Sequence, residues 1–504
     1  MQSGRRFFAV AALIAAASLV AHAHATPQSQ SADIQLQLAD LLFSEGKYQE
    51  SLEAYRNAER VAAPDLIRQA RTGVIISLLR VAEFELAREA AEKLIEANPR
   101  SPESLAVYGD ALWASGLFEQ AEVKYRDALS GTPELARGRH GLARSLAARG
   151  LLAESMNEAQ AALRLAPRDL ELHHTVGAIY ERMHKYEEAA TAYSNYVNLL
   201  PNKDASAKAS WSRAQIRFLR SFGQKVPFEA DAGSSDQVYA VPFRLVNEKI
   251  IIRVKVNGTG PNDFVVDTGS ESTVITRPMA LRLGVLPITQ TLSAGVGDVG
   301  LRGLQLGRVD LLEIGGLKLG NIPVLIKNPP LRDSQVRETE SLSPLALGYS
   351  MTVDYKKLEL TLAKHLPIEP ADVELPLRLY RLATVRGTID GKREANFVVD
   401  TGGQVISISQ ATASALGPAD ASRHIALRVF GTSGWDRDAF LMPGVNLAFD
   451  GIEFKNYSVV VLNLDTPSAL LGFQVGGIVG HKFLSAYKVG IDLERSTLRL
   501  KKAS

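Results

Sequence analysis

The chain has 504 residues, of which 46% are hydrophobic and 22% are charged, enough for about two to four domains with filled cores. The formal net charge is only +2, which excludes the global basic field expected of a nucleic-acid or anionic-membrane binder. The sequence contains no cysteine, which excludes thiol nucleophiles, thiolate metal sites, disulfides and a lipidated cysteine.

The first 25 residues have the pattern of a secretory signal. Arg5 and Arg6 precede an apolar run over residues 7–20, and small residues suited to cleavage lie just before Thr26. The alternative is a membrane anchor, but the run is shorter than the roughly 20 residues that a span requires. We therefore expect residues 1–25 to be a signal peptide of an exported, bacterial periplasmic protein, with no membrane span left after cleavage.

Residues 32–222 show an internal repeat. Its marker is a series of prolines spaced 34 residues apart, at Pro99, Pro133, Pro167 and Pro201. Helix-forming stretches lie between the prolines and carry small residues and tyrosines at recurrent offsets. Small residues let paired helices approach closely, aromatic rings fill the gaps, and proline ends a helix because it lacks the amide hydrogen. The pattern predicts an all-α array of helix pairs.

Five units are readable in this array, followed by a capping helix, and they begin near Ala32, Leu66, Pro102, Ala136 and Asp169. The pattern resembles tetratricopeptide repeats, which implies a solenoid whose concave surface binds a protein partner or a peptide. A spacer or an oligomerisation scaffold is the alternative. Residues 223–239 contain proline, glycine and serine and are predicted to be a linker.

Beyond residue 239 the pattern changes to short β-branched runs with turn residues between them. Two copies of one layout follow, over residues 240–366 and 372–502. Each copy contains the hexapeptide Phe-Val-Val-Asp-Thr-Gly, at residues 264–269 and 397–402, so the two aspartates are 133 positions apart. One copy alone is short for a filled core, whereas the two together make a domain of ordinary size.

The duplicated Asp-Thr-Gly, the later glycine-rich hairpin and a closing apolar-apolar-glycine segment resemble the retropepsin and pepsin family of aspartic peptidases. The resemblance implies an all-β, bilobed fold. Residues 478–480 supply the closing segment of the second copy, and residues 346–348 are the matching choice in the first. On this alignment the first copy is six residues shorter before the next shared aspartate (12 against 6), and it lacks a short helix.

Two carboxylates can hydrolyse a peptide bond without a metal or a cofactor. One, ionised, takes a proton from water, and the other, protonated, donates to the carbonyl oxygen. Because two such close charges cannot both ionise at neutral pH, the pair shares one proton. We expect Asp267 and Asp400 to form this dyad within one chain. The resemblance implies that Thr268 and Thr401 form hydrogen bonds across the pseudo-twofold axis and hold the carboxylates coplanar.

Gly269 and Gly402 permit backbone conformations and close approaches that a side chain would obstruct. After these glycines the copies differ, with Ser270 in the first and Gly403 in the second. A hydroxyl beside one aspartate and none beside the other would make the pair inequivalent. On this hypothesis Ser270→Ala shifts the pH profile.

The segment from residue 295 to 300 satisfies the Gly-x-Gly-x-x-Gly pattern of dinucleotide-binding proteins. That pattern needs a strand before it and a helix after it, but the following residues read as strands and turns, so we expect no nucleotide site. A flap over the substrate fits better, with its counterpart in the second copy; its residues are Gly295, Gly297, Gly300, Gly431, Gly434 and Trp435. Trp435 either stacks on the substrate or packs within its lobe.

The sequence therefore predicts an exported aspartic endopeptidase that acts on peptide or protein substrates, with a repeat array that recruits a protein substrate or partner. Neither a nucleic acid, a metal nor a cofactor is expected. The alternative is a catalytically silent peptide-binding or scaffold protein with the same fold.

Overall fold

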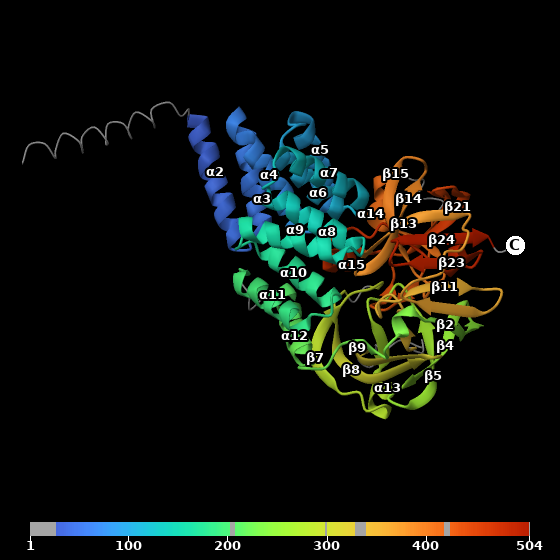
Figure 1. Cartoon of the computed structure of the whole chain (residues 1–504). Helices are drawn as coiled ribbons and strands as arrows, with labels where there is room; N and C mark the ends of the chain where they lie inside the picture. Colours follow the sequence, from blue (N-terminus) through green and yellow to red (C-terminus); the bar gives the residue numbers. More distant parts are fainter. Residues whose placement is uncertain (1–26, 202–206, 298–299, 328–338, 418–423, 503–504) are drawn as a thin grey trace, which may run out of the picture. The chain divides into compact units, whose positions relative to one another are not determined.

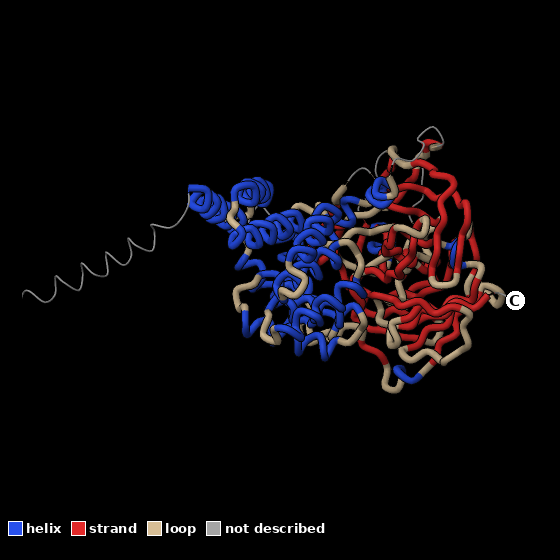
Figure 2. The backbone as a smooth tube through the Cα atoms, turned by 90° about the horizontal axis from the view of Figure 1, so that it is seen from above, coloured by secondary structure: helices blue, strands red, loops and turns tan. Residues whose placement is uncertain are grey.

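The computed structural model describes residues 27–201, 207–297, 300–327, 339–417 and 424–502, so the expected signal peptide lies outside the described residues. Two compact units divide the chain, residues 1–100 and 101–504. Helices make up the N-terminal part of the chain and strands the C-terminal part (Figures 1 and 2). No helix among the described residues is long and apolar enough to cross a membrane.

The helices follow one another in pairs, as the repeat predicts, and α12 comes last. In the first unit they are α2 (Pro27–Ser44), α3 (Tyr48–Val61), α4 (Pro64–Arg80) and α5 (Phe84–Ala97). In the second unit they are α6 (Pro102–Ala114), α7 (Phe118–Gly131), α8 (Ala136–Ala148), α9 (Leu152–Leu165), α10 (Leu170–Arg182), α11 (Tyr186–Leu199) and α12 (Ala207–Arg220). The predicted fold class, an α array followed by an all-β region, is confirmed.

The residues that mark the repeat act as expected. Pro133 and Pro167 follow the last residues of α7 and α9 by two positions and prevent either helix from continuing. A Cβ atom on Gly141 of α8 would lie 2.1 Å from the ring of Tyr125 on α7, so only glycine fits there. Gly177 has the same relation to Tyr193, at 2.8 Å. Small residue and aromatic ring thus determine how closely neighbouring helices pack.

The β region consists of two lobes with equivalent strands. The first lobe contains β3 (Arg244–Val246), β4 (Lys249–Val256), β5 (Thr259–Val266), β6 (Thr273–Thr276), α13 (Arg277–Arg282), β7 (Pro287–Ser293), β8 (Arg302–Ile314), β9 (Leu317–Lys327) and β10 (Ser341–Leu342). The second contains β14 (Leu382–Ile389), β15 (Arg393–Val399), β16 (Ile406–Ser409), α14 (Gln410–Ala415), β17 (Ile425–Ala426), β18 (Val429–Gly431), β19 (Gly434–Asp436), β20 (Phe440–Phe449), β21 (Ile452–Leu462), α15 (Asp465–Leu471), β22 (Gly477–Val479) and α16 (His481–Leu484).

Strand order shows the duplication directly. The order β9-β6-β10-β5-β4-β8 in the first lobe corresponds, strand for strand, to β21-β16-β22-β15-β14-β20 in the second. Between the lobes runs the order β13-β24-β23-β11-β12-β2, in which each half supplies three strands. These strands are β2 (Val238–Pro242), β11 (Ser350–Asp354), β12 (Glu359–Ala363), β13 (Val373–Tyr380), β23 (Tyr487–Asp492) and β24 (Thr497–Lys502). The pairing of β11 with β23 therefore joins the two halves into one sheet.

The segment predicted as a linker, residues 223–239, contains the short strand β1 (Glu229–Ala230) and a 3-10 turn (Ser234–Asp236). β1 pairs with β9 at the edge of the first lobe, where Glu229 lies opposite Gly320. Part of this segment thus belongs to the sheet of the first lobe.

The alignment of the two closing segments was wrong. In the second lobe β22 pairs in parallel with β15, and Val479 lies opposite Val399. In the first lobe the strand in that position is β10, and Leu342 lies opposite Val266. Leu342, rather than Leu347, is therefore the equivalent of Val479.

With this register the first lobe is not shortened by six residues. Ser343 corresponds to Gly480, so the spans to the shared aspartates are 11 and 12 residues. A helical turn is also present in the first lobe, because the amide of Leu347 donates to Ser343 O at 3.3 Å, as that of Leu484 does to Gly480 O at 3.2 Å. The similar spelling of residues 346–348 and 478–480 is coincidental.

Candidate active site

The two Asp-Thr-Gly segments begin where equivalent strands end. Asp267 follows β5 and Asp400 follows β15. The amide of Asp267 donates to Leu342 O at 2.9 Å, and the amide of Asp400 donates to Val479 O at 3.0 Å. Phe264 and Phe397, at the start of the two hexapeptides, are fully buried. Each aspartate is thus fixed by a buried strand behind it and a parallel strand beside it.

The threonines join the two lobes by a reciprocal set of hydrogen bonds. The amide of Thr268 donates to Thr401 Oγ1 at 3.1 Å, and the amide of Thr401 donates to Thr268 Oγ1 at 3.1 Å. Each hydroxyl also donates onward, Thr268 Oγ1 to Val399 O at 2.6 Å and Thr401 Oγ1 to Val266 O at 2.8 Å. Both threonines are buried, so these four bonds hold the two aspartate loops together without competition from water.

Each glycine of the two motifs lies against the carboxylate of the opposite lobe. A Cβ atom on Gly269 would lie 2.5 Å from Asp400 Cγ, and one on Gly402 would lie 2.8 Å from Asp267 Cγ. Any side chain here would displace a carboxylate. The third residue of Asp-Thr-Gly must therefore be glycine, because the aspartate of the other lobe lies so close to it.

The surroundings raise the pKa of both carboxyl groups. Burial is the first cause for Asp267, and the neighbouring charge of Asp400 and a hydrogen bond to it add to the effect, raising its pKa to about 7. Burial also raises the pKa of Asp400, but the backbone amides of Gly402 and Gly403 oppose the rise. The pair therefore shares a proton, and the backbone amides beside Asp400 favour the charged form of that carboxyl group.

The amides that oppose the rise also make the two aspartates inequivalent. The amide of Gly402 donates to Asp400 Oδ1 at 2.8 Å, and a Cβ atom on Gly403 would lie 2.6 Å from Asp400 Oδ2. The Ser270 hydroxyl, which the sequence suggested as the cause, instead donates to Ser272 O at 2.9 Å. The difference between Ser270 and Gly403 therefore makes the two aspartates inequivalent mainly because Gly403 has no side chain beside the Asp400 carboxylate.

The two predicted flap segments contact each other. The amide of Gly295 donates to Ser433 Oγ at 3.0 Å, and the amide of Ser433 donates to Val296 O at 2.9 Å. A Cβ atom on Gly297 would lie 2.3 Å from the backbone carbon of Ser433, and one on Gly431 would lie 2.3 Å from Val296 O. The glycines thus allow two backbones from different lobes to meet.

The remaining flap residues fit the same arrangement. Gly434 begins β19, and Gly300 lies close to the start of β8, which is a strand and not the helix of a dinucleotide site. Trp435 pairs with Phe430 across the β18–β19 hairpin, with ring centroids 5.2 Å apart, and remains partly exposed. Trp435 therefore packs within its own hairpin and keeps one part of its ring available.

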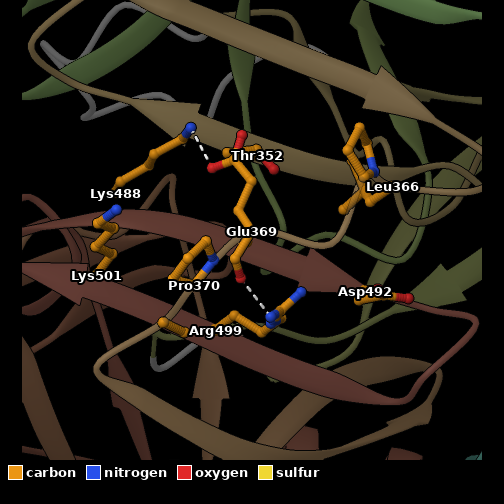
Figure 3. A pocket seen from close by; sticks show the side chains of 11 residues that line it. Thr352, Leu366, Glu369, Pro370, Lys488, Asp492, Arg499 and Lys501 are labelled. Atoms are coloured by element: carbon orange, nitrogen blue, oxygen red, sulfur yellow. Dashed lines mark hydrogen bonds and ion pairs between the residues drawn. The ribbon is translucent and has the colours of Figure 1, made fainter.

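A separate hollow lies on the sheet between the lobes (Figure 3), and its lining includes Thr352, Glu369, Lys488 and Arg499. Lys488 forms an ion pair with Glu369, and Arg499 donates to the carbonyl of the same residue. Asp492, which also lines it, accepts from the amide and the guanidinium of Arg495. Ion pairs and hydrogen bonds between its lining residues thus cross the hollow, and Asp492 has a structural role.

Sequence reasoning noted Gly403 only as the counterpart of Ser270 and missed that it leaves room for the Asp400 carboxylate. It also missed the ion pair between Glu271 and Arg381, with Oε2 and Nε 2.7 Å apart, which leaves no signal in the sequence because the two residues are 110 positions apart.

Comparison with known proteins identifies a family that matches the region containing this site. Residues 252–351 and 385–475 match the family model described as "Aspartyl protease". A search of curated proteins found no match.

Among solved structures, the chain is similar to a thermophilic TPR protein of Thermus thermophilus (19% identity, 36% of this chain and 98% of that one, TM-score 0.31). It is also similar to pilF of Pseudomonas aeruginosa (16% identity, 39% and 87%, TM-score 0.29). A third is YrrB, described as a TPR protein with an unusual peptide-binding site (17% identity, 36% and 90%, TM-score 0.23). The resemblances read from the sequence are confirmed: a helical repeat array precedes a β region whose two halves both match the aspartyl protease family.

Proposed function

We propose that this protein is an exported aspartic endopeptidase in which Asp267 and Asp400 activate a water molecule between them. One observation carries the proposal. The two carboxyl groups are held beside each other by reciprocal threonine bonds and by glycines that admit no side chain, in surroundings that raise the pKa of both.

The chemistry follows from the inequivalence of the pair. Asp400, ionised and supported by backbone amides, accepts a proton from water as the water oxygen bonds to the carbonyl carbon of the substrate. Asp267 donates its proton to the carbonyl oxygen, which gives a neutral tetrahedral diol. Proton transfer from Asp400 to the peptide nitrogen then lets the carbon–nitrogen bond break, and a hydroxyl proton of the diol returns to Asp267. Each step leaves one proton on the pair.

A shortened first lobe would favour the alternative, a silent peptide-binding module, but with the corrected register of β10 the first lobe is not shortened. Trp435 leaves an aromatic surface partly exposed beside the contact between the flap segments. A complete first lobe and both aspartates favour the enzyme.

Cleavage of a mixed peptide library between about pH 4 and 7 tests the proposal, because a carboxylate pair can hold one proton in this range. Asp267→Asn and Asp400→Asn should each abolish cleavage. Asp263→Asn is the matched control. Asp263 lies on β5, the strand that leads to Asp267, but it is exposed and pairs with Arg244 away from the dyad. Peptide binding without cleavage by the unaltered protein would establish the silent module instead.

We further propose that the helical array recruits a protein substrate or partner, and that residues 1–25 direct export to the bacterial periplasm. Support for export comes from the cationic and apolar pattern of these residues. N-terminal sequencing of the protein secreted by a bacterial host should begin at Thr26. An intact N-terminus on a cytoplasmic product would refute the export proposal.

A further inference from the structure

The turn between β13 and β14, residues 379–382, lies against helices of the array. The ring of Tyr380 packs on Trp113 of α6 and on Phe473, with centroids 5.1 Å and 6.1 Å away. Arg182, at the end of α10, donates to Leu379 O at 3.2 Å and also to Ala147 O on α8. Helices α6, α8 and α10 are the first helices of three successive pairs, so the turn rests on one continuous surface of the array.

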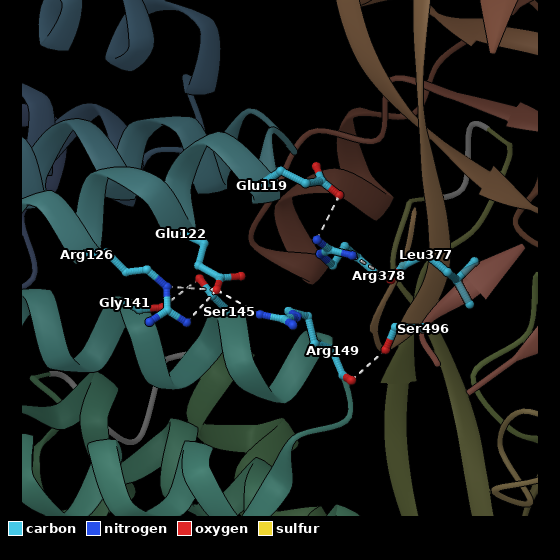
Figure 4. A network of polar contacts seen from close by, with 9 residues as sticks. All are labelled: Glu119, Glu122, Arg126, Gly141, Ser145, Arg149, Leu377, Arg378 and Ser496. Atoms are coloured by element: carbon cyan, nitrogen blue, oxygen red, sulfur yellow. Dashed lines mark hydrogen bonds and ion pairs between the residues drawn. The ribbon is translucent and has the colours of Figure 1, made fainter. Parts of the chain in front are cut away.

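Neighbouring contacts attach the array to the same lobe (Figure 4). Arg378 on β13 forms an ion pair with Glu119 of α7 at 3.4 Å, and Ser496 Oγ donates to Arg149 O at 2.6 Å. The array thus contacts β13 at Arg378 and the β23–β24 turn at Ser496, whose carbonyl accepts from the amide of Leu377 on β13 at 2.8 Å.

Arg381 connects this turn to the dyad. Its guanidinium lies over the ring of Trp211 on α12, 5.9 Å from the centroid, and it also donates to Leu470 O at 3.0 Å. The same guanidinium forms the 2.7 Å ion pair with Glu271. Glu271 follows Asp267 by four residues, in the loop that leads to β6. A single side chain therefore touches the array, the second lobe and the aspartate loop of the first.

The backbone conformation of Arg381 indicates that surrounding contacts hold this residue in its position. Its φ angle is +62°, in the left-handed region that residues other than glycine seldom adopt. Such a conformation persists only where surrounding contacts determine it. Here those contacts are the pairing of Tyr380 with Leu382 across the turn, the packing of Tyr380 on Trp113, and the hydrogen bond from Arg182 to Leu379 O.

We propose that the helical array controls the dyad of its own chain through this turn, with Arg182, Arg381 and Glu271 as positioning residues. Arg182 and the surface under Tyr380 hold the turn, the turn holds Arg381, and Arg381 holds the Glu271 loop beside Asp267. The inference rests on the proposed peptidase function for its effect on catalysis, but the mechanical link is independent of it. The array is then part of the enzyme's working structure, in addition to any partner that it recruits.

Variants of the full-length protein test each link. Arg182→Gln and Arg381→Gln should each raise backbone amide exchange in residues 264–275 and lower kcat/KM roughly tenfold, because small displacements of reacting groups are costly. Arg381→Lys keeps the charge and should recover part of the loss. Arg244→Gln is the matched control, since it removes an exposed ion pair to Asp263 on the strand of the dyad, and it should change neither quantity.

A double-mutant cycle tests whether the link is continuous. Arg182 donates to backbone carbonyls of the turn and of α8, whereas Glu271 pairs with Arg381, so independent effects of the two substitutions would multiply. Coupling through Arg381 predicts that Arg182→Gln with Glu271→Gln loses less activity than the product of the single effects. Trp211→Leu, which removes the ring over Arg381 from another helix, provides a second route if Arg182→Gln fails to fold.

Two outcomes would overturn the proposal. One is multiplicative effects in the cycle, and the other is increased exchange confined to α8 and α10 with residues 264–275 unchanged. Absence of cleavage by the unaltered protein would refute the proposed function instead, and the exchange measurements would still decide whether the array is linked to the Asp267 loop.

Discussion

Replacing Thr401 by valine isolates the contribution of the hydrogen bonds between the lobes. Valine has the same branched shape as threonine but no hydroxyl, so the substitution removes two hydrogen bonds and leaves the methyl group in place. These are the bond from Thr401 Oγ1 to Val266 O at 2.8 Å and the bond from the amide of Thr268 to Thr401 Oγ1 at 3.1 Å. The substitution leaves the buried amide of Thr268 without this acceptor and removes one donor to the buried carbonyl of Val266.

The expected cost can be worked from these two groups. A buried donor or acceptor that loses its partner costs about 1–3 kcal/mol, so the loss at both groups should destabilise this part of the protein by about 2–6 kcal/mol in Thr401→Val. Thr401→Ser keeps the hydroxyl and loses one methyl group, so its cost should be about 1 kcal/mol. The reciprocal bond from the amide of Thr401 to Thr268 Oγ1 remains in both variants.

Native-state amide exchange of peptides that cover residues 264–269 and 397–402 is the suitable assay, because it reports opening of this site apart from unfolding of the helices. Thr401→Val should accelerate exchange in both peptides, since the lost bonds join the two lobes. Equal exchange in Thr401→Val and Thr401→Ser would refute the reasoning, as it would show that the hydroxyl contributes nothing. Acceleration confined to residues 397–402 would show that the lobes are held together elsewhere.

Three further predictions concern the dyad and the array. Because burial and Asp400 raise the pKa of Asp267 to about 7, cleavage should fall as pH rises through about 7, where the shared proton is lost, and a profile flat to pH 9 would contradict the assignment. Ser270→Ala should leave the pH profile of cleavage in place, because its hydroxyl donates to a backbone carbonyl; a shift would restore the hypothesis drawn from the sequence. Gly141→Ala should lower the free energy of unfolding of the array, measured by urea titration of helical circular dichroism, by about 1–3 kcal/mol through overpacking, and no change would mean that the helices separate freely.

Much of the fold could be predicted because its signals are local or periodic. Pro133 and Pro167 mark helix ends by chemistry that acts on a neighbouring turn, and a fixed period shows that the unit is repeated. The proximity of Asp267 and Asp400 was equally accessible, since two copies of one hexapeptide in one chain indicate two halves of one site. In both cases the chemical type of the residue explains why it occupies that position.

The rest depended on contacts between distant segments. The strand that completes the first lobe was assigned to residues 346–348 by spelling, whereas the register with Val266 selects Leu342. Two residues that are far apart in sequence meet when Arg381 reaches Glu271, and neither lies in a motif. A parallel pairing or an ion pair across lobes is determined by tertiary structure, so a single sequence contains little trace of it.

Duplication alone does not explain how two half-sites keep a common geometry, because each lobe is free to move unless it is tied to the other. Three ties act at different depths: the pairing of β11 with β23, the buried bonds of Thr268 and Thr401, and the ion pair of Arg381. The helices add a fourth, since α12 also contacts the first lobe through the hydrogen bond from Arg217 to Thr289. The first two ties are buried in the sheet and the core, whereas the last two are partly exposed and involve helix α12, through Trp211 beside Arg381 and through Arg217. Regulation is therefore expected at the array, where ties can be changed without unfolding the lobes.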